Sequence, residues 1–150
     1  MAYWLLKSEP QDYSYTDLEQ DGQTIWNGVK NPLALKYLRT MQPTDKALIY
    51  HSGKERQVVG VAEIITPAYP DPALDDPKRL VVDLRPVRSL PQPVTLVQIK
   101  QDGNFTGFDL IRLPRLSIVP VSAEYWQQIL QLAGEGKEGN RGAQEEGPQG

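Results

Sequence analysis

The sequence predicts an α+β fold in which a mixed β-barrel is flanked by a few short helices. Short apolar segments dominate the chain, helix-start signals lie between them, and two of the segments are apolar on both faces. The 150 residues contain 39% hydrophobic and 23% charged side chains, which is ordinary for one globular domain with its own core. No internal repeat is visible, so a single compact barrel is the simplest interpretation.

The predicted strands are short runs rich in β-branched, aromatic and leucine side chains. They cover residues 2–7, 46–51, 58–66, 80–87, 94–99 and 116–121. Two parts of them, residues 47–50 and 58–62, are apolar on both faces and should lie at the centre of the sheet. Proline-bearing loops at residues 67–77 and 89–93 are expected to separate the later strands.

Two helices are expected in the first third of the chain. Ser14 and Asp17 have the spacing of a capping pair and predict a short helix that begins after Ser14. Asn31 is a good N-cap and Pro32 a good first helical residue, and apolar side chains then continue at helical spacing. A second helix is therefore expected over residues 32–41.

A third helix should close the domain. Ser122 can cap it and Gly134 can end it. The apolar stripe expected to pack against the core consists of Trp126, Ile129, Leu130 and Ala133. From residue 134 onward no large apolar side chain occurs, so we divide the chain into a folded domain at residues 1–133 and a disordered Gly/Glu-rich tail at residues 134–150.

The composition excludes several classes of site. The chain has no cysteine and one histidine, His51, which excludes a disulfide, a thiolate zinc site and a multi-histidine metal centre. We expect no cofactor. No apolar run approaches the length of a membrane span, and residues 1–9 lack the basic start and long apolar segment of a secretion signal, so the predicted location is cytoplasmic.

Charge is distributed unevenly along the chain. The tail at residues 134–150 holds four acidic and two basic side chains, so the folded body is close to neutral in net charge. Residues 30–56 instead hold six basic and two acidic side chains. A near-neutral body argues against strong indiscriminate binding of nucleic acid, whereas a weak or pocket-directed contact remains open.

The segment around Trp26 is the best candidate for a binding site. Trp26 precedes the helix that Asn31 caps, and the polar residues Asn27 and Lys30 lie on the same approach. A flat aromatic side chain beside free helix-start amides suits a planar ligand attached to an anion, such as a base in a polynucleotide. Burial in the core is the simplest alternative for Trp26 taken alone.

An enzymatic interpretation rests on His51 and Ser52, with serine as nucleophile and histidine as base. Adjacent residues on a strand project to opposite faces, so their side chains do not readily form the activating hydrogen bond. Glu9 and Asp83 would be a carboxylate pair only if the fold brought them together, which the sequence does not establish. We therefore predict no catalytic residue. His51 and Ser52 are candidates for the polar lining of a pocket, and a satisfied hydrogen-bond network at the end of the strand is the alternative when the two residues are taken alone.

Several separated motifs carry a family resemblance. They are WLLKSEP at residues 4–10, WNGVKN at 26–31, YHS at 50–52, GVAE at 60–63 and RLS at 115–117. In this order they resemble the EVE domain over about residues 2–132. The resemblance implies the PUA-like fold, a mixed β-barrel shared with YTH and ASCH domains, and a role in recognising modified nucleobases, in DNA in several cases.

The more distant similarity to YTH domains, which read modified adenine, implies roles for individual residues. Trp26 would form one wall of an aromatic cage, Lys7 would approach a phosphate, and Ser8 or Glu9 would lie near the base edge. Asn27 could present polar groups beside the base. The second wall is left open, because the YTH-like position offers only Tyr69 in a proline-rich loop.

The sequence thus predicts a non-enzymatic module that binds a modified base, cytosine or adenine, in DNA or RNA. The candidate ligand-binding residues are Lys7, Ser8, Glu9, Trp26, Asn27, Asn31, Tyr50, His51 and Ser52. The expected partner is nucleic acid rather than a membrane, and any effector protein is unidentified. Two alternatives remain: a small-molecule or nucleoside-processing enzyme that uses the same cavity, and a protein-interaction module.

Overall fold

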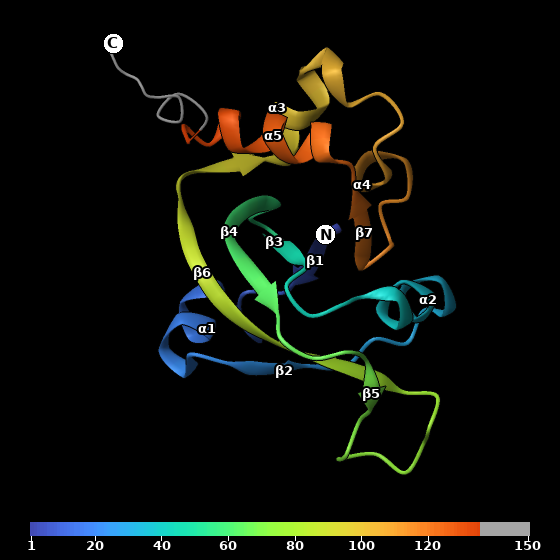
Figure 1. The fold of residues 1–150 in the computed structure, drawn as a ribbon. Helices are drawn as coiled ribbons and strands as arrows, with labels where there is room; N and C mark the ends of the chain where they lie inside the picture. The colour runs from blue at the N-terminus through green and yellow to red at the C-terminus, as the bar shows by residue number, and fades with distance from the viewer. Residues whose placement is uncertain (136–150) are drawn as a thin grey trace.

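The computed structural model describes residues 1–135, and the fold is built on one curled sheet (Figure 1). Its strands are β1 (Tyr3–Ser8), β2 (Thr24–Trp26), β3 (Lys46–His51), β4 (Gln57–Ile64), β5 (Tyr69–Pro70), β6 (Leu80–Thr95) and β7 (Ile118–Val121). Its helices are α1 (Tyr15–Asp21), α2 (Pro32–Thr40), α3 (Leu96–Gln101), α4 (Asp109–Arg112) and α5 (Ala123–Leu132), with a 3₁₀ turn at Gly103–Phe105. The predicted α+β class, a barrel-like mixed sheet with short helices, is confirmed.

The sheet is mixed because one of its strand pairs is parallel. The strand order is β2-β6-β4-β3-β1-β7, with β5 paired to β6 outside this path. β1 runs parallel to β3, whereas the other pairs are antiparallel. β3 and β4, whose sequences are apolar on both faces, lie in the middle of the sheet as predicted, and most of their residues are buried.

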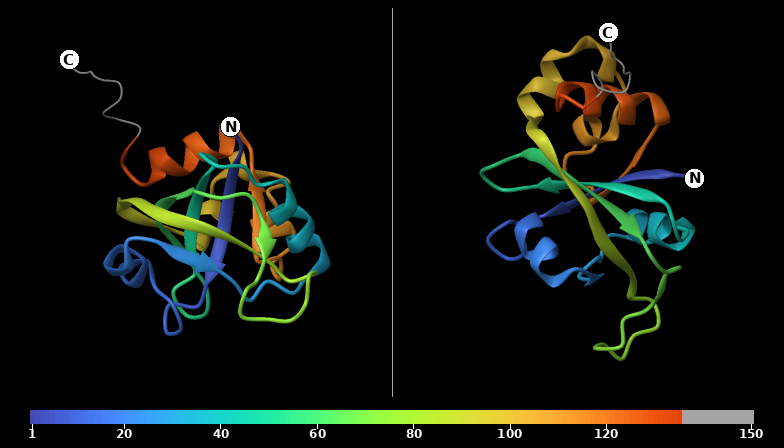
Figure 2. Two further views of the ribbon diagram at one scale, coloured as in Figure 1. Left: turned by 60° about the horizontal axis from the view of Figure 1, so that its bottom comes forward. Right: turned by 60° about the vertical axis from the view of Figure 1, so that its left-hand side comes forward.

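The long strand β6 gives the sheet its curl. It runs from the 67–79 loop at one end of the molecule to α3 at the other (Figure 2). α5 and α3 cover one end of the half-barrel, while α1 and α2 lie near its opposite end (Figure 1). The pairing of β6 with β4 shifts register at two places, which bends both strands.

The predicted helix caps are confirmed. Ser14 and Asp17 form a reciprocal capping box at the start of α1. The side-chain oxygen of Asn31 accepts hydrogen bonds from two amides in the first turn of α2, and Pro32 is its first residue. Ser122 caps α5, which ends next to Gly134 in a left-handed conformation at φ 92°.

The end of β6 differs from the prediction in two ways. Residues 89–93 were expected to form a loop, but they belong to β6. Here Val58 pairs with Val94 and Gly60 pairs with Ser89, so residues 90–93 form a bulge that accommodates two prolines without ladder hydrogen bonds. The strand expected at residues 94–99 ends at Thr95, because Thr95 and Gln98 form a capping box that starts α3.

β2 is not among the strands that the sequence predicts. Its three residues pair with β6, and Trp26 lies opposite Val82. A strand this short has no detectable periodicity in the sequence. The predicted disorder at residues 134–150 concerns a segment that lies, from residue 136 onward, outside the described residues.

Candidate functional site

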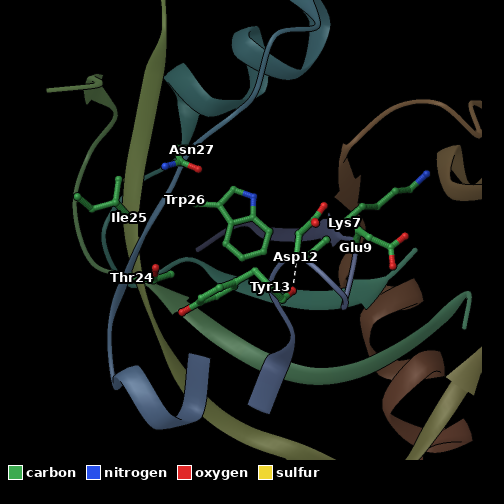
Figure 3. Close-up of a pocket in the computed structure, with 9 residues that line it drawn as sticks. Lys7, Glu9, Asp12, Tyr13, Thr24, Ile25, Trp26 and Asn27 are labelled. Atoms are coloured by element: carbon green, nitrogen blue, oxygen red, sulfur yellow. Dashed lines mark hydrogen bonds between the residues drawn. The ribbon is translucent and has the colours of Figure 1, made fainter. Parts of the chain in front are cut away.

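A cavity of about 490 Å³ opens between the end of β1, the loop that follows it, and β2 (Figure 3). Its lining residues are Lys7, Ser8, Glu9, Asp12, Tyr13, Thr24, Ile25, Trp26 and Asn27. The volume is within the range of small-molecule sites in proteins. Pairing of β2 with β6 holds Trp26 against the core, while β1 carries Lys7 and Ser8 to the opposite side of the cavity.

Trp26 is mainly a buried residue, with 8% of its surface exposed. It belongs to the hydrophobic core cluster and also lines the cavity. Trp26 therefore packs in the core and lines the cavity at the same time. Its packing in the core gives the cavity a rigid aromatic wall.

Tyr13 is a second aromatic side chain in the cavity, which the sequence reasoning missed. Its ring lies 6.5 Å from that of Trp26, with an interplanar angle of 81°. Its hydroxyl donates to Asp21 at 2.7 Å, and its carbonyl oxygen accepts from the Ser8 hydroxyl at 2.5 Å. Burial raises the pKa of the Tyr13 phenol further above neutrality, and the protonated hydroxyl is a hydrogen-bond donor.

Tyr69, the aromatic side chain considered for the second wall, does not line this cavity. Its hydroxyl donates to Asp83 on β6 at 2.5 Å. This hydrogen bond is the largest of the causes that raise the pKa of Tyr69 to about 12, followed by burial and the charges of Asp83 and Asp71. Tyr13 lies only five residues beyond Ser8, but a single tyrosine in a polar loop gives no periodic signal, and only the tertiary structure identifies it.

Two carboxylates give the cavity an acidic, hydrogen-bond-accepting side. Glu9 and Asp12 lie on the same side of the indole as Lys7 in Figure 3. Glu9 Oε1 accepts from the Gln11 amide at 3.4 Å, and Glu9 also packs against Gly53, where an added Cβ would overlap the carboxylate. Ionised carboxylates accept hydrogen bonds only, so this side of the cavity suits a ligand that presents N–H groups.

Lys7 lies at the rim, and its ammonium is directed away from Trp26 (Figure 3). The Nζ atom donates to the carbonyl oxygen of Pro114 at 2.9 Å and lies 5.8 Å from the centre of the Tyr50 ring. Partial burial lowers the pKa of this amine. A phosphate at the rim would compete with the Pro114 carbonyl for the Lys7 ammonium.

The structure brings five of the nine candidate residues into this cavity: Lys7, Ser8, Glu9, Trp26 and Asn27. The other four lie outside it. Asn31 caps α2 and lines a neighbouring groove, and Tyr50 is buried beside the Lys7 side chain. Ser52 donates its backbone amide to Ser8. Contact of these residues with a ligand stays a prediction.

His51 is held in a buried hydrogen-bond network. Its Nε2 atom accepts the Tyr15 amide at 3.0 Å, and its Nδ1 atom lies 2.8 Å from Glu55 Oε1. Because an amide can only donate, Nε2 is unprotonated and Nδ1 carries the proton toward Glu55. Among residues 1–135 no hydrogen bond joins the His51 and Ser52 side chains, so this geometry does not activate Ser52.

Within residues 1–135, no three histidine, cysteine or acidic side chains gather in a way that could hold a metal ion. None of the helices in this part of the chain has the length and apolar character required to cross a membrane.

Comparisons with known proteins agree with the motif resemblance. A family model described as EVE domain matches residues 2–132. Thymocyte nuclear protein 1 of Mus musculus is 33% identical over an alignment that covers 87% of this chain and 73% of that protein. The Gallus gallus protein of the same name is 34% identical, with 87% and 68% covered.

Solved structures extend the comparison to the fold. A protein from Rhodopseudomonas palustris has a TM-score of 0.88 at 35% identity, covering 95% of this chain and 100% of that one. Human thymocyte nuclear protein 1 in complex with 5-methylcytosine-containing DNA has a TM-score of 0.81 at 30% identity, covering 89% and 98%. A YTH domain from Zygosaccharomyces rouxii shares the fold more distantly, with a TM-score of 0.53 at 18% identity over 88% and 86% of the two chains. From its motifs, its fold and these matches, the chain belongs to the EVE domain family.

Proposed function

We propose that this chain is a non-enzymatic module that binds a modified nucleobase, with modified cytosine in DNA as its first candidate ligand. The observation that carries the proposal is the cavity in which the Trp26 and Tyr13 rings meet beside two carboxylates. The human relative that is 30% identical has been solved with 5-methylcytosine-containing DNA, which supports cytosine and DNA over other choices.

The chemistry of the cavity suits an unpaired base. A base that leaves its stack presents a flat face that can lie against an aromatic side chain, and an edge that needs fixed hydrogen-bond partners. The amino group of cytosine is a donor, and carboxylates such as Glu9 and Asp12 accept from it. Ser8 and Asn27 add polar groups that can pair with the remaining edge atoms.

A single methyl group provides little binding energy. Its burial contributes about 1 kcal/mol, so selectivity for a modified base also depends on the shape of the cavity. Ile25, 43% exposed at the cavity, offers an apolar surface for such a group. Lys7 at the rim is the candidate partner for the adjoining phosphate, in exchange for its present bond to Pro114.

The position of His51 favours binding over catalysis. Both of its ring nitrogens are engaged, with the Tyr15 amide and Glu55, and neither faces Ser52. An enzyme built on this pair would first have to break the network that starts α1. We therefore expect no turnover of nucleosides or esters by the protein or by its His51→Ala variant.

The proposal is tested by titrating the protein with matched oligonucleotides at fixed moderate salt. The panel contains single- and double-stranded DNA and RNA with unmodified cytosine, 5-methylcytosine, adenine or N6-methyladenine. Trp26→Phe and Tyr13→Ala serve as pocket variants, because Trp26→Ala would also remove a core residue, and thermal unfolding of each variant checks its fold. A preference for 5-methylcytosine DNA that falls in Tyr13→Ala supports the proposal.

Other outcomes of the panel exclude parts of the proposal. A preference for N6-methyladenine or for RNA would keep the pocket and change its ligand. Equal, salt-sensitive binding to every strand would refute base recognition. Absence of nucleic-acid binding, together with a peptide partner whose binding survives Tyr13→Ala, would replace it by the protein-interaction alternative.

A further inference from the structure

A second cavity, of about 320 Å³, lies between the start of α2 and the segment that follows α4. Its lining residues are Asn31, Leu33, Arg112, Leu113, Pro114, Arg115 and Leu116. The apolar members form most of its surface, and two arginines and one asparagine provide its polar groups. Leu33, one of the lining residues, is 36% exposed and so offers apolar surface to a ligand.

This groove adjoins the base pocket at two places. Lys7 lines the pocket, and its ammonium lies 2.9 Å from the carbonyl oxygen of Pro114, which lines the groove. On the other side, Asn27 lines the pocket and Asn31 lines the groove, four residues further along the same loop. The rim of the pocket at Lys7 therefore lies next to the groove at Pro114.

The two arginines of the groove differ in their freedom. Arg112 is held by Asp109, whose Oδ1 atom accepts from Nε at 3.0 Å and from Nη2 at 2.8 Å. Arg115 is exposed and makes no ion pair with any residue in the range 1–135. A guanidinium held in one plane suits stacking on a base, whereas an exposed, uncompensated one suits a phosphate.

We propose that the groove holds the nucleotide next to the inserted base on the same strand. Its base lies on the apolar surface of Leu33 and Pro114 beside the Arg112 guanidinium, and Arg115 contacts the phosphate between the two nucleotides. Asn31 uses its side-chain oxygen to cap α2, which leaves its amide nitrogen to donate to this nucleotide. This inference rests on the proposed function, because the groove is reached from an occupied pocket.

The size and charge of the groove favour this occupant. A volume of about 320 Å³ is near the lower end for ligand sites, which fits one ring system better than an amphipathic helix. Arg115, whose charge is not balanced by an ion pair within residues 1–135, favours an anionic ligand over an apolar peptide. Most of the lining is apolar, which distinguishes the groove from a site that binds phosphate alone.

The first experiment uses the intact protein and varies only the ligand. Affinity is measured for the 5-methyl-dC mononucleotide, for a trinucleotide with 5-methyl-dC at its centre, and for trinucleotides with an abasic site on the 5′ or the 3′ side. One stacked base strengthens binding by roughly fivefold or more, so one of the two abasic ligands should lose that amount and the other should not. Equal affinities of the mononucleotide and all three trinucleotides would overturn the inference.

The second experiment varies the groove. Arg115→Ala should weaken trinucleotide binding by roughly threefold to tenfold, and the dependence of its affinity on salt should fall by the amount expected for about one lost phosphate contact. Arg39→Ala is the matched control, because Arg39 is an exposed arginine at the far end of α2. Leu33→Asp should weaken trinucleotide binding but preserve mononucleotide binding. An acidic residue is favourable in the first turn of a helix, so this variant should fold.

The two proposals fail in different ways. If Tyr13→Ala abolishes binding of the mononucleotide while Arg115→Ala and Leu33→Asp leave the trinucleotide unaffected, the base pocket stands and the groove is refuted. If the mononucleotide and the trinucleotides do not bind and the oligonucleotide panel shows no base preference, the proposed function is refuted and the groove proposal with it.

Discussion

The rings of Tyr13 and Trp26 meet almost at right angles, with centroids 6.5 Å apart. Tyr13 comes from the loop after β1, and Trp26 comes from β2, on the other side of α1. The pair therefore depends on the position of α1, whose first amide is bonded to His51 on β3. The geometry of this aromatic pair is thus linked to the core of the sheet through Tyr15 and His51.

The Tyr13 ring should contribute directly to binding. Tyr13→Ala removes one aromatic wall and is expected to weaken binding of a modified-base oligonucleotide by about 1–3 kcal/mol, as for other base–aromatic contacts. Tyr13→Phe keeps the ring and should bind nearly as well as the wild type. Tyr69→Phe, a change outside the cavity, is the control, and fluorescence or calorimetric titration is the measurement. Equal affinity in Tyr13→Ala and Tyr69→Phe would remove Tyr13 from the site.

Gly60 should not tolerate a side chain. A Cβ atom there would overlap the ring of Tyr15, whose hydroxyl donates to the Val61 carbonyl oxygen at 2.7 Å. Gly60→Ala is therefore expected to lower the free energy of unfolding by about 1–3 kcal/mol through overpacking. Gly103→Ala, where nothing lies within 4 Å of the added atom, should change it by no more than about 0.5 kcal/mol. Urea unfolding compares the two, and equal effects would contradict the close contact.

Tyr15 should make the fold sensitive to alkali. Burial, as the largest cause, raises the pKa of its phenol from 10.0 to about 12. The folded state then keeps a proton that the unfolded state loses above pH 10, so this stabilisation is complete below pH 10 and disappears as the pH approaches 12. The effect amounts to roughly 2–3 kcal/mol.

Denaturant unfolding at several pH values between 9 and about 11.5 tests this effect, since the window is set by the pKa of Tyr15. Tyr15→Phe lowers stability near neutral pH because the Val61 carbonyl loses its donor, but its stability should fall less steeply with pH than that of the wild type. Parallel curves for the two proteins would show that Tyr15 does not titrate as described. Tyr69→Phe controls for the other strongly shifted tyrosine.

His51 should be a structural residue. His51→Ala removes the acceptor of the Tyr15 amide and the partner of Glu55, and is expected to cost about 1–3 kcal/mol of stability. The neighbouring Ser52→Ala should have an effect within about 0.5 kcal/mol. Thermal and urea unfolding give both values. A destabilisation no larger than that of Ser52→Ala would show that the His51 network is dispensable.

Local signals in the sequence predicted much of the fold. Caps at Ser14, Asn31 and Ser122 identified three helices, because each cap is made within four residues. Thr95 and Gln98, the capping box that starts α3, give the same kind of signal. This signal was missed because the predicted strand at residues 94–99 includes both residues. β2 could not be found this way, because three residues acquire strand structure only from their pairing with β6.

The motifs of the sequence by themselves determined the family, the central position of two strands and one wall of the candidate site, Trp26. Only the tertiary structure decided the other wall, Tyr13, and the separation of His51 and Asn31 from the cavity. Helix caps, strand patterns and family motifs depend on residues that are close together in the sequence, so they can be recognised without the structure. The second wall depends on where the loop after β1 folds back against β2, and that is determined by packing among residues distant in the chain.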